Sequence, residues 1–165
     1  MYKVGDYVMT ANNGVCEIKD ITTMDSMSNS KGTQFCVLVP VTEQTAKVYI
    51  PEDRMDTRCR NVVDPDEMKH FIDEIPTIET EDIKSDKERE LMYKDVIQSC
   101  DIKKMIAVLK NMNKRKQARL AMGKKNIAME ERYQKIIEKN LFSECAFVLN
   151  KSADEVKELF VTCEQ

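Results

Sequence analysis

The sequence predicts an α+β protein in which a small β unit is followed by an all-α bundle. Residues 1 to about 60 contain short apolar runs separated by turn residues, which is typical of short strands. After about residue 61, apolar residues recur at the three- and four-residue spacing of helices. The 165 residues contain only four glycines and four prolines but eleven methionines, a composition that favours helices in the longer part. We therefore expect two domains, residues 1–60 and residues 61–165.

The first sixty residues predict four or five short strands in a small, strongly bent sheet or barrel. Asn12-Asn13-Gly14 is a tight-turn signal that separates the first two strands. Asp25–Gly32 is a polar loop, and Lys47–Ile50 alternates polar and apolar residues before Pro51. The expected strands are residues 7–9, 14–21, 34–41 and 47–50.

The second part predicts about five helices, and start and stop signals set their limits. Asp64-Pro65 begins the first helix and Pro76 ends it. Ser85 with Glu88 forms a capping box for the second helix, which runs to about Gln98. The third helix is capped by Ser99 or Asp101 and ends near Gly123. A fourth carries Tyr133, Ile137 and Leu141 at helical spacing, and Ser152 with Glu155 caps the last.

Chemistry-bearing motifs are scarce. The sequence has no GxGxxG, GxxxxGK[ST], GxSxG or HExxH motif, and its one histidine, His70, lies off the apolar face of its helix. The six cysteines form no CxxC pair, so we expect reduced, buried thiols and no metal site or cofactor. No apolar run approaches the roughly 18 residues that cross a bilayer, and the first ten residues lack a signal-peptide core. We expect a cytoplasmic, non-enzymatic protein with no small-molecule substrate.

Charge is unevenly distributed along the chain although the net charge is only −3. The stretch from Ile102 to Met129 contains nine basic residues and no acidic residue, so its mutual repulsion is not relieved locally. We expect the acidic pair Glu130-Glu131 that follows it to be a solvated helix face. The basic residues are Lys103, Lys104, Lys110, Lys114, Arg115, Lys116, Arg119, Lys124 and Lys125.

Neutralising phosphates is a natural role for such a surface, and we favour a nucleic acid over the alternatives. A solvated helix face and binding to anionic lipid are the other interpretations. No aromatic residue lies between Tyr93 and Tyr133, so backbone contacts to a duplex, with little base specificity, are the better prediction than stacking on single strands. The candidate DNA-binding residues are Lys110, Lys114, Arg115, Arg119, Lys124 and Lys125.

Ordered motifs along the chain resemble the CarD/CdnL transcription regulators. The resemblance begins with Tyr2–Val8 (YKVGDYV) and Gly14-Val15. It continues through Lys47–Pro51 (KVYIP) and Arg60, and the helical part follows it through Asp101 and the 102–112 helix. It therefore spans nearly the whole chain.

The resemblance implies an N-terminal Tudor-like β-barrel that binds the β subunit of bacterial RNA polymerase. It also implies a C-terminal helical domain that touches promoter DNA near the upstream edge of the transcription bubble. Members of this kind stabilise the open promoter complex and catalyse no reaction. The same module occurs in the transcription-repair coupling factor, whose helicase motors this chain lacks. The residues that the resemblance points to for polymerase binding are Met24, Lys47, Val48, Tyr49 and Ile50.

An exposed edge strand can accept a strand from a partner, and Lys47–Ile50 is the candidate edge. Lys47 and Tyr49 are expected to point outward, with Val48 and Ile50 directed into the core. The chain departs from the family at three places. Thr10–Gly14 (TANNG) stands where members commonly have a Tyr-Pro-x-His-Gly turn. The chain has no tryptophan, where members place one against the DNA fork, and Asp86 lies near that position. It also has Tyr49 where some members have arginine. The alternative function is an adaptor that binds polymerase or another acidic partner without touching DNA.

Overall fold

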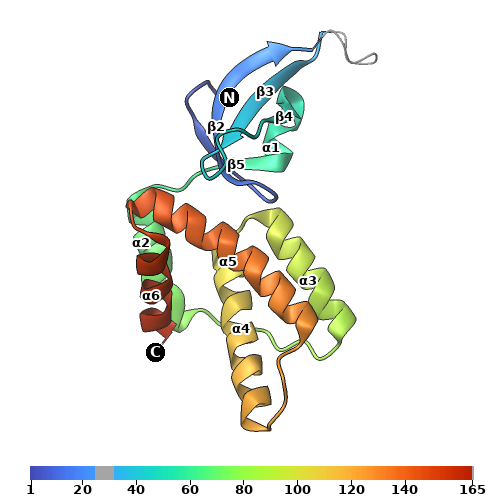
Figure 1. Ribbon diagram of the computed structural model, residues 1–165, viewed down its shortest axis with the longest axis vertical. Helices are drawn as coiled ribbons and strands as arrows, with labels where there is room; N and C mark the ends of the chain where they lie inside the picture. The colour runs from blue at the N-terminus through green and yellow to red at the C-terminus, as the bar shows by residue number, and fades with distance from the viewer. Residues whose placement is uncertain (25–31, 165) are drawn as a thin grey trace. The chain divides into compact units, whose positions relative to one another are not determined.

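The computed structural model describes residues 1–24 and 32–164 (Figure 1). The polar loop expected at Asp25–Gly32 lies, apart from Gly32, outside the described residues. Two compact units make up the chain, Met1–Val62 and Val63–Gln165. The first carries the strands and the second carries five of the helices, as the change of apolar spacing predicts.

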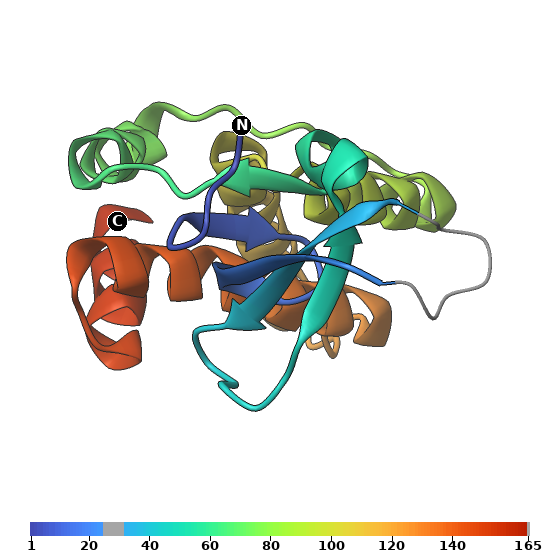
Figure 2. The ribbon, with the colours of Figure 1, turned by 90° about the horizontal axis from the view of Figure 1, so that it is seen from above.

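The first unit is a five-stranded antiparallel half-barrel with strand order β4-β3-β2-β1-β5. Figure 2 shows how strongly its long central strands curve. A short 3-10 turn, η1, and the four-residue helix α1 join the two edge strands β4 and β5. Five strands agree with the expected four or five, but neither β5 nor α1 was located from the sequence. The elements are β1 (Tyr7–Thr10), β2 (Gly14–Thr23), β3 (Gln34–Pro40), β4 (Val48–Pro51), η1 (Glu52–Arg54), α1 (Met55–Arg58) and β5 (Cys59–Asn61).

The turn between β1 and β2 forms where the Asn-Asn-Gly signal predicts it. Thr10 pairs with Gly14 in the ladder, and Gly14 has a φ of 67°, a left-handed conformation that glycine adopts without a steric penalty. The Thr10 hydroxyl accepts a hydrogen bond from the Asn13 amide at 3.1 Å. A local side-chain bond therefore holds the loop that sets the register of the hairpin.

One face of the sheet packs on a small apolar core. Val8, Ile18 and Leu38 from the central strands are fully buried, and Met55 and Cys59 close the core from α1 and β5. Ile50 belongs to the same cluster, and Val48 packs against it. Burial of alternate residues on β4 therefore fixes which side chains of this strand face outward.

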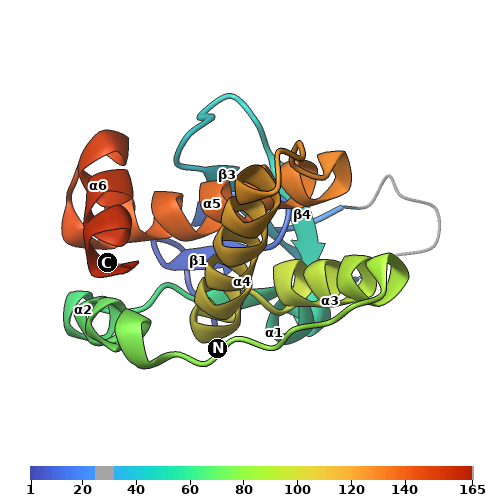
Figure 3. The same cartoon turned by 90° about the horizontal axis from the view of Figure 1, so that it is seen from below.

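The second unit is a helical bundle in which α5 contacts α2, α3, α4 and α6. Figure 3 shows α2 and α6 at one end of α5, and α3 and α4 along the rest of it. Its core includes Met68, Tyr93, Met105, Ile137 and Leu141, each essentially without exposed surface. The elements are α2 (Pro65–Glu74), η2 (Ile75–Thr77), α3 (Asp86–Ser99), α4 (Ile102–Ala121), α5 (Ala128–Leu149) and α6 (Ala153–Glu164).

Helix boundaries follow the capping signals in the sequence. The side chains of Asp64, Ser85 and Asp101 accept hydrogen bonds from backbone amides in the first turns of α2, α3 and α4. Asp101, one of the two expected caps of the third helix, is therefore the actual one. Ser152 and Glu155 bond reciprocally at the start of α6, which is the expected capping box.

Candidate functional site

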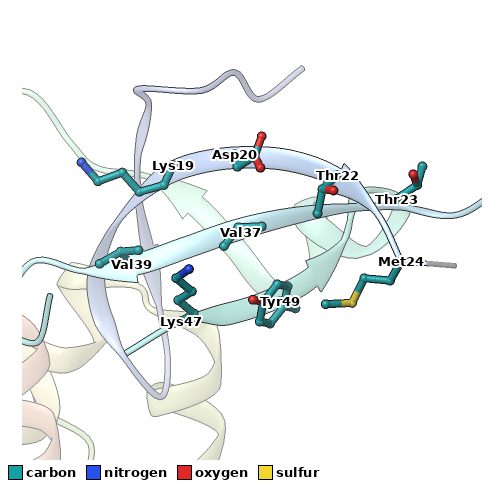
Figure 4. A pocket seen from close by; sticks show the side chains of 9 residues that line it. All are labelled: Lys19, Asp20, Thr22, Thr23, Met24, Val37, Val39, Lys47 and Tyr49. Carbon is teal, nitrogen blue, oxygen red and sulfur yellow. The ribbon is translucent and has the colours of Figure 1, made fainter. Parts of the chain in front are cut away.

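The outward face of the sheet carries a shallow hollow, which we call the sheet hollow (Figure 4). Three of the five residues expected to bind polymerase, Met24, Lys47 and Tyr49, line it. Figure 4 shows the Met24 side chain pointing toward the Tyr49 ring. Tyr49 is 43% exposed, so an aromatic ring stands open to a partner at this place. The remaining lining residues are Lys19, Asp20, Thr22, Thr23, Val37 and Val39.

Strand pairing builds the sheet hollow from residues far apart in the chain. Val37 of β3 lies opposite Tyr49 of β4 and opposite Asp20 of β2. The β2–β3 register shifts between Ile18 and Asp20, so an extra residue, Lys19, is accommodated in β2. Lys19 and Asp20 therefore both line the hollow, and Lys19 pairs with Glu17 at 2.6 Å.

The floor of the sheet hollow is apolar although it lies on the outward face. Val37 is 6% and Val39 8% exposed, and Figure 4 shows Val37 between Asp20 of β2 and Tyr49 of β4. β3 is therefore buried on both faces, as its nearly continuous apolar sequence predicts. An apolar floor inside a rim of lysine, aspartate and threonine suits a protein partner that buries an apolar side chain there.

The other two residues expected to bind polymerase lie on the opposite face of β4. Ile50 is buried in the core, and Val48 packs against it, as the alternation of β4 predicts. β4 is an edge of the sheet among the described strands, so its backbone is available for pairing along one side. The backbone of β4 can reach a partner along its free side, whereas Met24, Lys47 and Tyr49 present side chains.

The comparison with protein families matches residues 2–63 to the CarD-like/TRCF RID domain. The first unit is a CarD-like/TRCF RID domain. This is consistent with membership of the CarD/CdnL family, which the ordered motifs predict. Domains of this kind bind the β subunit of RNA polymerase and are generally not catalytic. The comparison with curated proteins finds no match.

The match ends at residue 63, and the helical unit follows the RID domain without a counterpart in it. Helices within residues 1–24 and 32–164 are either too short or too polar to cross a bilayer. In the same residues, His, Cys, Asp and Glu side chains form no group of three that could hold a metal ion.

Four of the six candidate DNA-binding residues gather around one hollow of the helical unit, which we call the basic hollow. They are Lys114, Arg115, Arg119 and Lys124. Asp82 also lines it and lies 3.7 Å from an Arg115 guanidinium nitrogen, so the hollow is not purely basic. Its four cations nevertheless outnumber the single carboxylate, and the hollow offers a concentrated site for phosphate oxygens.

Lys110 lies apart from the basic hollow and makes internal contacts. Its ammonium group donates to the carbonyl oxygens of Ile75 at 2.6 Å and Ile78 at 2.7 Å. These carbonyls belong to η2 and the residue after it, where a helix end leaves acceptors without helical partners. Lys110 therefore fastens the end of α2 and η2 to α4.

The remaining candidate, Lys125, does not line the basic hollow. Its backbone carbonyl accepts a hydrogen bond from Arg119 Nε at 2.9 Å. Arg119 thereby fixes the loop that carries Lys124 and Lys125, and it also lines the hollow.

We expected both Glu130 and Glu131 to be exposed, and this prediction is wrong for Glu130. Glu130 is 1% exposed, and one of its oxygens, Oε1, lies 3.1 Å from Arg89 Nε and 2.9 Å from Arg115 Nε. The Tyr93 hydroxyl is 3.3 Å from the same oxygen. Burial of a carboxylate is costly unless cations and donors compensate its lost hydration. Two arginines do so at Oε1, whereas Oε2 is buried without a hydrogen-bond partner among the described residues.

Arg89 is as buried as its partner, at 2% exposure. It also donates to the carbonyls of Ile83 and Lys84 at 2.7 and 2.8 Å and pairs with Asp86. Burial raises the pKa of the nearby Tyr93 to about 12, and the negative charge of Glu130 contributes in the same direction. The cluster joins α3, α4 and α5 behind the basic hollow.

The basic stretch is also less self-repelling than its sequence suggests. Its charges are relieved by acids from other segments, because Lys103 pairs with Glu74 at 3.8 Å and Arg115 with Glu130. Sequence spacing gives no sign of these pairs, which join residues 15 to 29 positions apart. His70 is exposed, as expected, and lies 3.4 Å from Glu74.

Proposed function

We propose that this chain is a transcription regulator that binds the RNA polymerase β subunit through its RID domain and contacts promoter DNA through the basic hollow. In this role it modulates the stability of the open promoter complex. The match of residues 2–63 to the RID domain is the observation that carries the proposal. No reaction is part of the proposed function.

The sheet hollow and the β4 edge supply the proposed polymerase surface. An edge strand recognises an extended partner through main-chain hydrogen bonds, and side chains beside it give specificity. Tyr49 provides an exposed ring over the apolar floor, with Met24 and Lys47 next to it. Val48 and Ile50 contribute backbone groups to the edge and hold it in place through the core.

Cations at the basic hollow support the proposed DNA contact, because they attract phosphate groups. Lys114, Arg119 and Lys124 are at the basic hollow and make no ion pair with any described carboxylate. Such cations bind the backbone of a duplex and provide affinity and register with little sequence readout. We place Arg115 behind them, because its Nε already donates to buried Glu130.

An adaptor that binds polymerase without touching DNA is the second candidate function. The internal bonds of Lys110 to the carbonyls of Ile75 and Ile78 favour it, because they remove one cation from the proposed DNA surface. The Asp82 carboxylate at the basic hollow favours it as well, because it repels phosphate.

The lifetime of open promoter complexes tests the proposal and separates the two candidates. The full chain is added to RNA polymerase at a promoter as wild type, as Tyr49→Ala, and as Lys114→Ala/Arg119→Ala/Lys124→Ala. We expect both variants to lose the effect of the wild type on lifetime, while only Tyr49→Ala loses binding to polymerase. A triple variant that acts like the wild type would support the adaptor and reject the DNA contact.

A further inference from the structure

A groove on the helical unit, which adjoins the basic hollow at Asn111, combines an apolar floor with an acidic rim. It lies between α3, α4 and the segment that connects η2 to α3, and its volume is about 570 Å³, enough for several side chains. We call it the acidic groove. Residues of α3 and α4 line two of its sides, and these helices lie side by side in Figure 3. Neither polymerase binding nor DNA binding, as proposed above, uses this surface.

The acids of this region separate into two groups. Glu79, Glu81, Glu88 and Asp95 line the acidic groove, and none of them forms an ion pair with any residue in the described part of the chain. The three other acids between residues 79 and 95 each pair with an arginine or lysine, and none of these three lines the groove. They are Asp82, Asp86 and Glu90.

This division concentrates uncompensated negative charge at one place. Four carboxylates face a single rim lysine, Lys104. Like charges gathered on a surface repel one another, and a cationic partner relieves that repulsion. The rim is therefore complementary to a basic segment.

The floor of the groove adds an apolar component. Val96 and Val108 are each 5% exposed, whereas Leu91 at the edge is 53% exposed. A leucine that extends into water beside two buried valines leaves apolar area for a partner side chain to cover. The complementary segment must therefore be apolar as well as basic.

A buried acceptor without a partner lies in the same groove. Asn111 lines both this groove and the basic hollow, is 7% exposed, and its Oδ1 makes no hydrogen bond with any described residue. A buried acceptor left unsatisfied is costly, and a donor from a bound molecule removes that cost. Lysine, arginine or a backbone amide of a partner supplies such a donor.

We infer that the acidic groove is a docking site for a basic amphipathic segment of another protein. Its apolar side chains cover Leu91 and the valine floor, its cations meet the four rim carboxylates, and one donor reaches Asn111 Oδ1. The chain thereby carries a protein-binding surface on the helical unit, separate from that of the RID domain.

A synthetic amphipathic peptide of leucine and lysine, titrated into the full chain by calorimetry, tests this inference. We expect saturable one-to-one binding that weakens about tenfold in Glu81→Lys/Asp95→Lys, because both rim charges are reversed. Glu67→Lys/Asp73→Lys changes the net charge equally on exposed positions of α2 and is expected to bind as the wild type does. A peptide with glutamate in place of lysine is expected not to bind.

A second variant separates docking from simple charge attraction. Asn111→Leu keeps the charge and removes the unpaired acceptor, so we expect weaker peptide binding with an unchanged urea unfolding midpoint or a higher one. Equal weakening by the α2 control pair would overturn the inference, because it would show non-specific attraction. Absence of saturable binding up to about 1 mM peptide, the weak limit of specific recognition, would overturn it as well.

Discussion

Arg115 Nε donates to Glu130 Oε1 across 2.9 Å, so a cation from the middle of the basic stretch is bound to a carboxylate that is 1% exposed. Arg89 approaches the same oxygen from α3. The contact links the wall of the basic hollow to the interior of the bundle. Arg115 therefore positions α4 against α5. The same residue also lines the basic hollow at the surface.

Glu130→Ala is expected to destabilise the helical unit strongly. It leaves buried Arg89 with only the exposed carboxylate of Asp86 as a charge partner among the described residues, and breaking a buried ion pair in this way typically costs about 3–5 kcal/mol. Urea unfolding followed by circular dichroism measures the loss. Glu131→Ala, at the exposed neighbouring position, is the control and is expected to change stability by less than about 0.5 kcal/mol. Equal stability of the two variants would reject a structural role for the cluster.

Lys114→Ala/Arg119→Ala/Lys124→Ala is expected to weaken duplex binding and to flatten its salt dependence. Each lost phosphate contact reduces the slope of log affinity against log salt by about 0.9. Arg115 is left intact because its removal would disturb Glu130. Fluorescence anisotropy at several salt concentrations measures both quantities, with Lys135→Ala/Lys139→Ala/Lys157→Ala on α5 and α6 as the charge-matched control. The same slope in both triple variants would place the DNA surface elsewhere.

Lys110→Met is expected to affect stability more than DNA affinity. The change removes a charged donor from the carbonyls of Ile75 and Ile78, and a hydrogen bond to a charged group is worth about 1.5–3 kcal/mol. Urea unfolding and the anisotropy titration are compared on the same protein. Lys87→Met, an exposed lysine of α3, serves as the control. If DNA affinity instead depended less on salt while stability stayed unchanged, Lys110 would belong to the DNA-binding surface.

Neighbouring residues of β4 are expected to give opposite phenotypes. Ile50→Ala removes buried volume from the RID core and should cost about 2–5 kcal/mol, whereas Tyr49→Ala should leave stability within about 0.5 kcal/mol. Tyr49→Ala should instead reduce affinity for polymerase by tenfold or more, because exposed aromatic residues are frequent hot spots. Thermal unfolding and an affinity titration distinguish the two effects. Loss of stability in Tyr49→Ala would show that its ring supports the fold.

Local signals predicted much of the fold. Asp64-Pro65, Ser85 with Glu88, and Ser152 with Glu155 locate helix starts because the capping bond joins residues three apart. The Asn-Asn-Gly turn and the alternation around Tyr49 locate the hairpin and orient β4. These features depend on neighbouring residues, so one sequence is enough to see them.

The buried charge cluster could not be predicted in the same way. Glu130 follows nine basic residues and precedes another glutamate, a context that indicates a solvated face. Its burial depends on Arg89, 41 positions earlier, which only the packing of α3 on α5 brings near. The contact of Lys110 with Ile75 joins residues 35 positions apart and was missed for the same reason.

Cysteine reactivity is expected to be low and to rise with pH. Burial raises the pKa of the Cys16 thiol to about 11, and burial with the charge of Glu144 does the same for Cys145. The thiolate is the reactive form, so both should resist alkylation near pH 8 and react faster as the pH approaches 11. Because the folded state favours the protonated thiols, its stability should fall as the pH rises from about 9 to 11. Only Cys163 is not buried.

Mass spectrometry after iodoacetamide treatment at pH 8 checks this, and one modification at Cys163 is the expected result. Denaturation in urea before treatment should expose all six thiols. Rapid modification of Cys16 or Cys145 in the folded protein would contradict the burial of these residues.

Site-specific photo-crosslinking from position 49 to RNA polymerase tests the central claim most directly. A photoreactive phenylalanine analogue replaces Tyr49 in the full chain, and the same analogue at Asn61 on the opposite edge strand β5 is the control. We predict a crosslink from position 49 to the β subunit and a much weaker one, or none, from position 61. A crosslink from position 61 alone, or from position 49 to another subunit, would contradict binding of β through the sheet hollow.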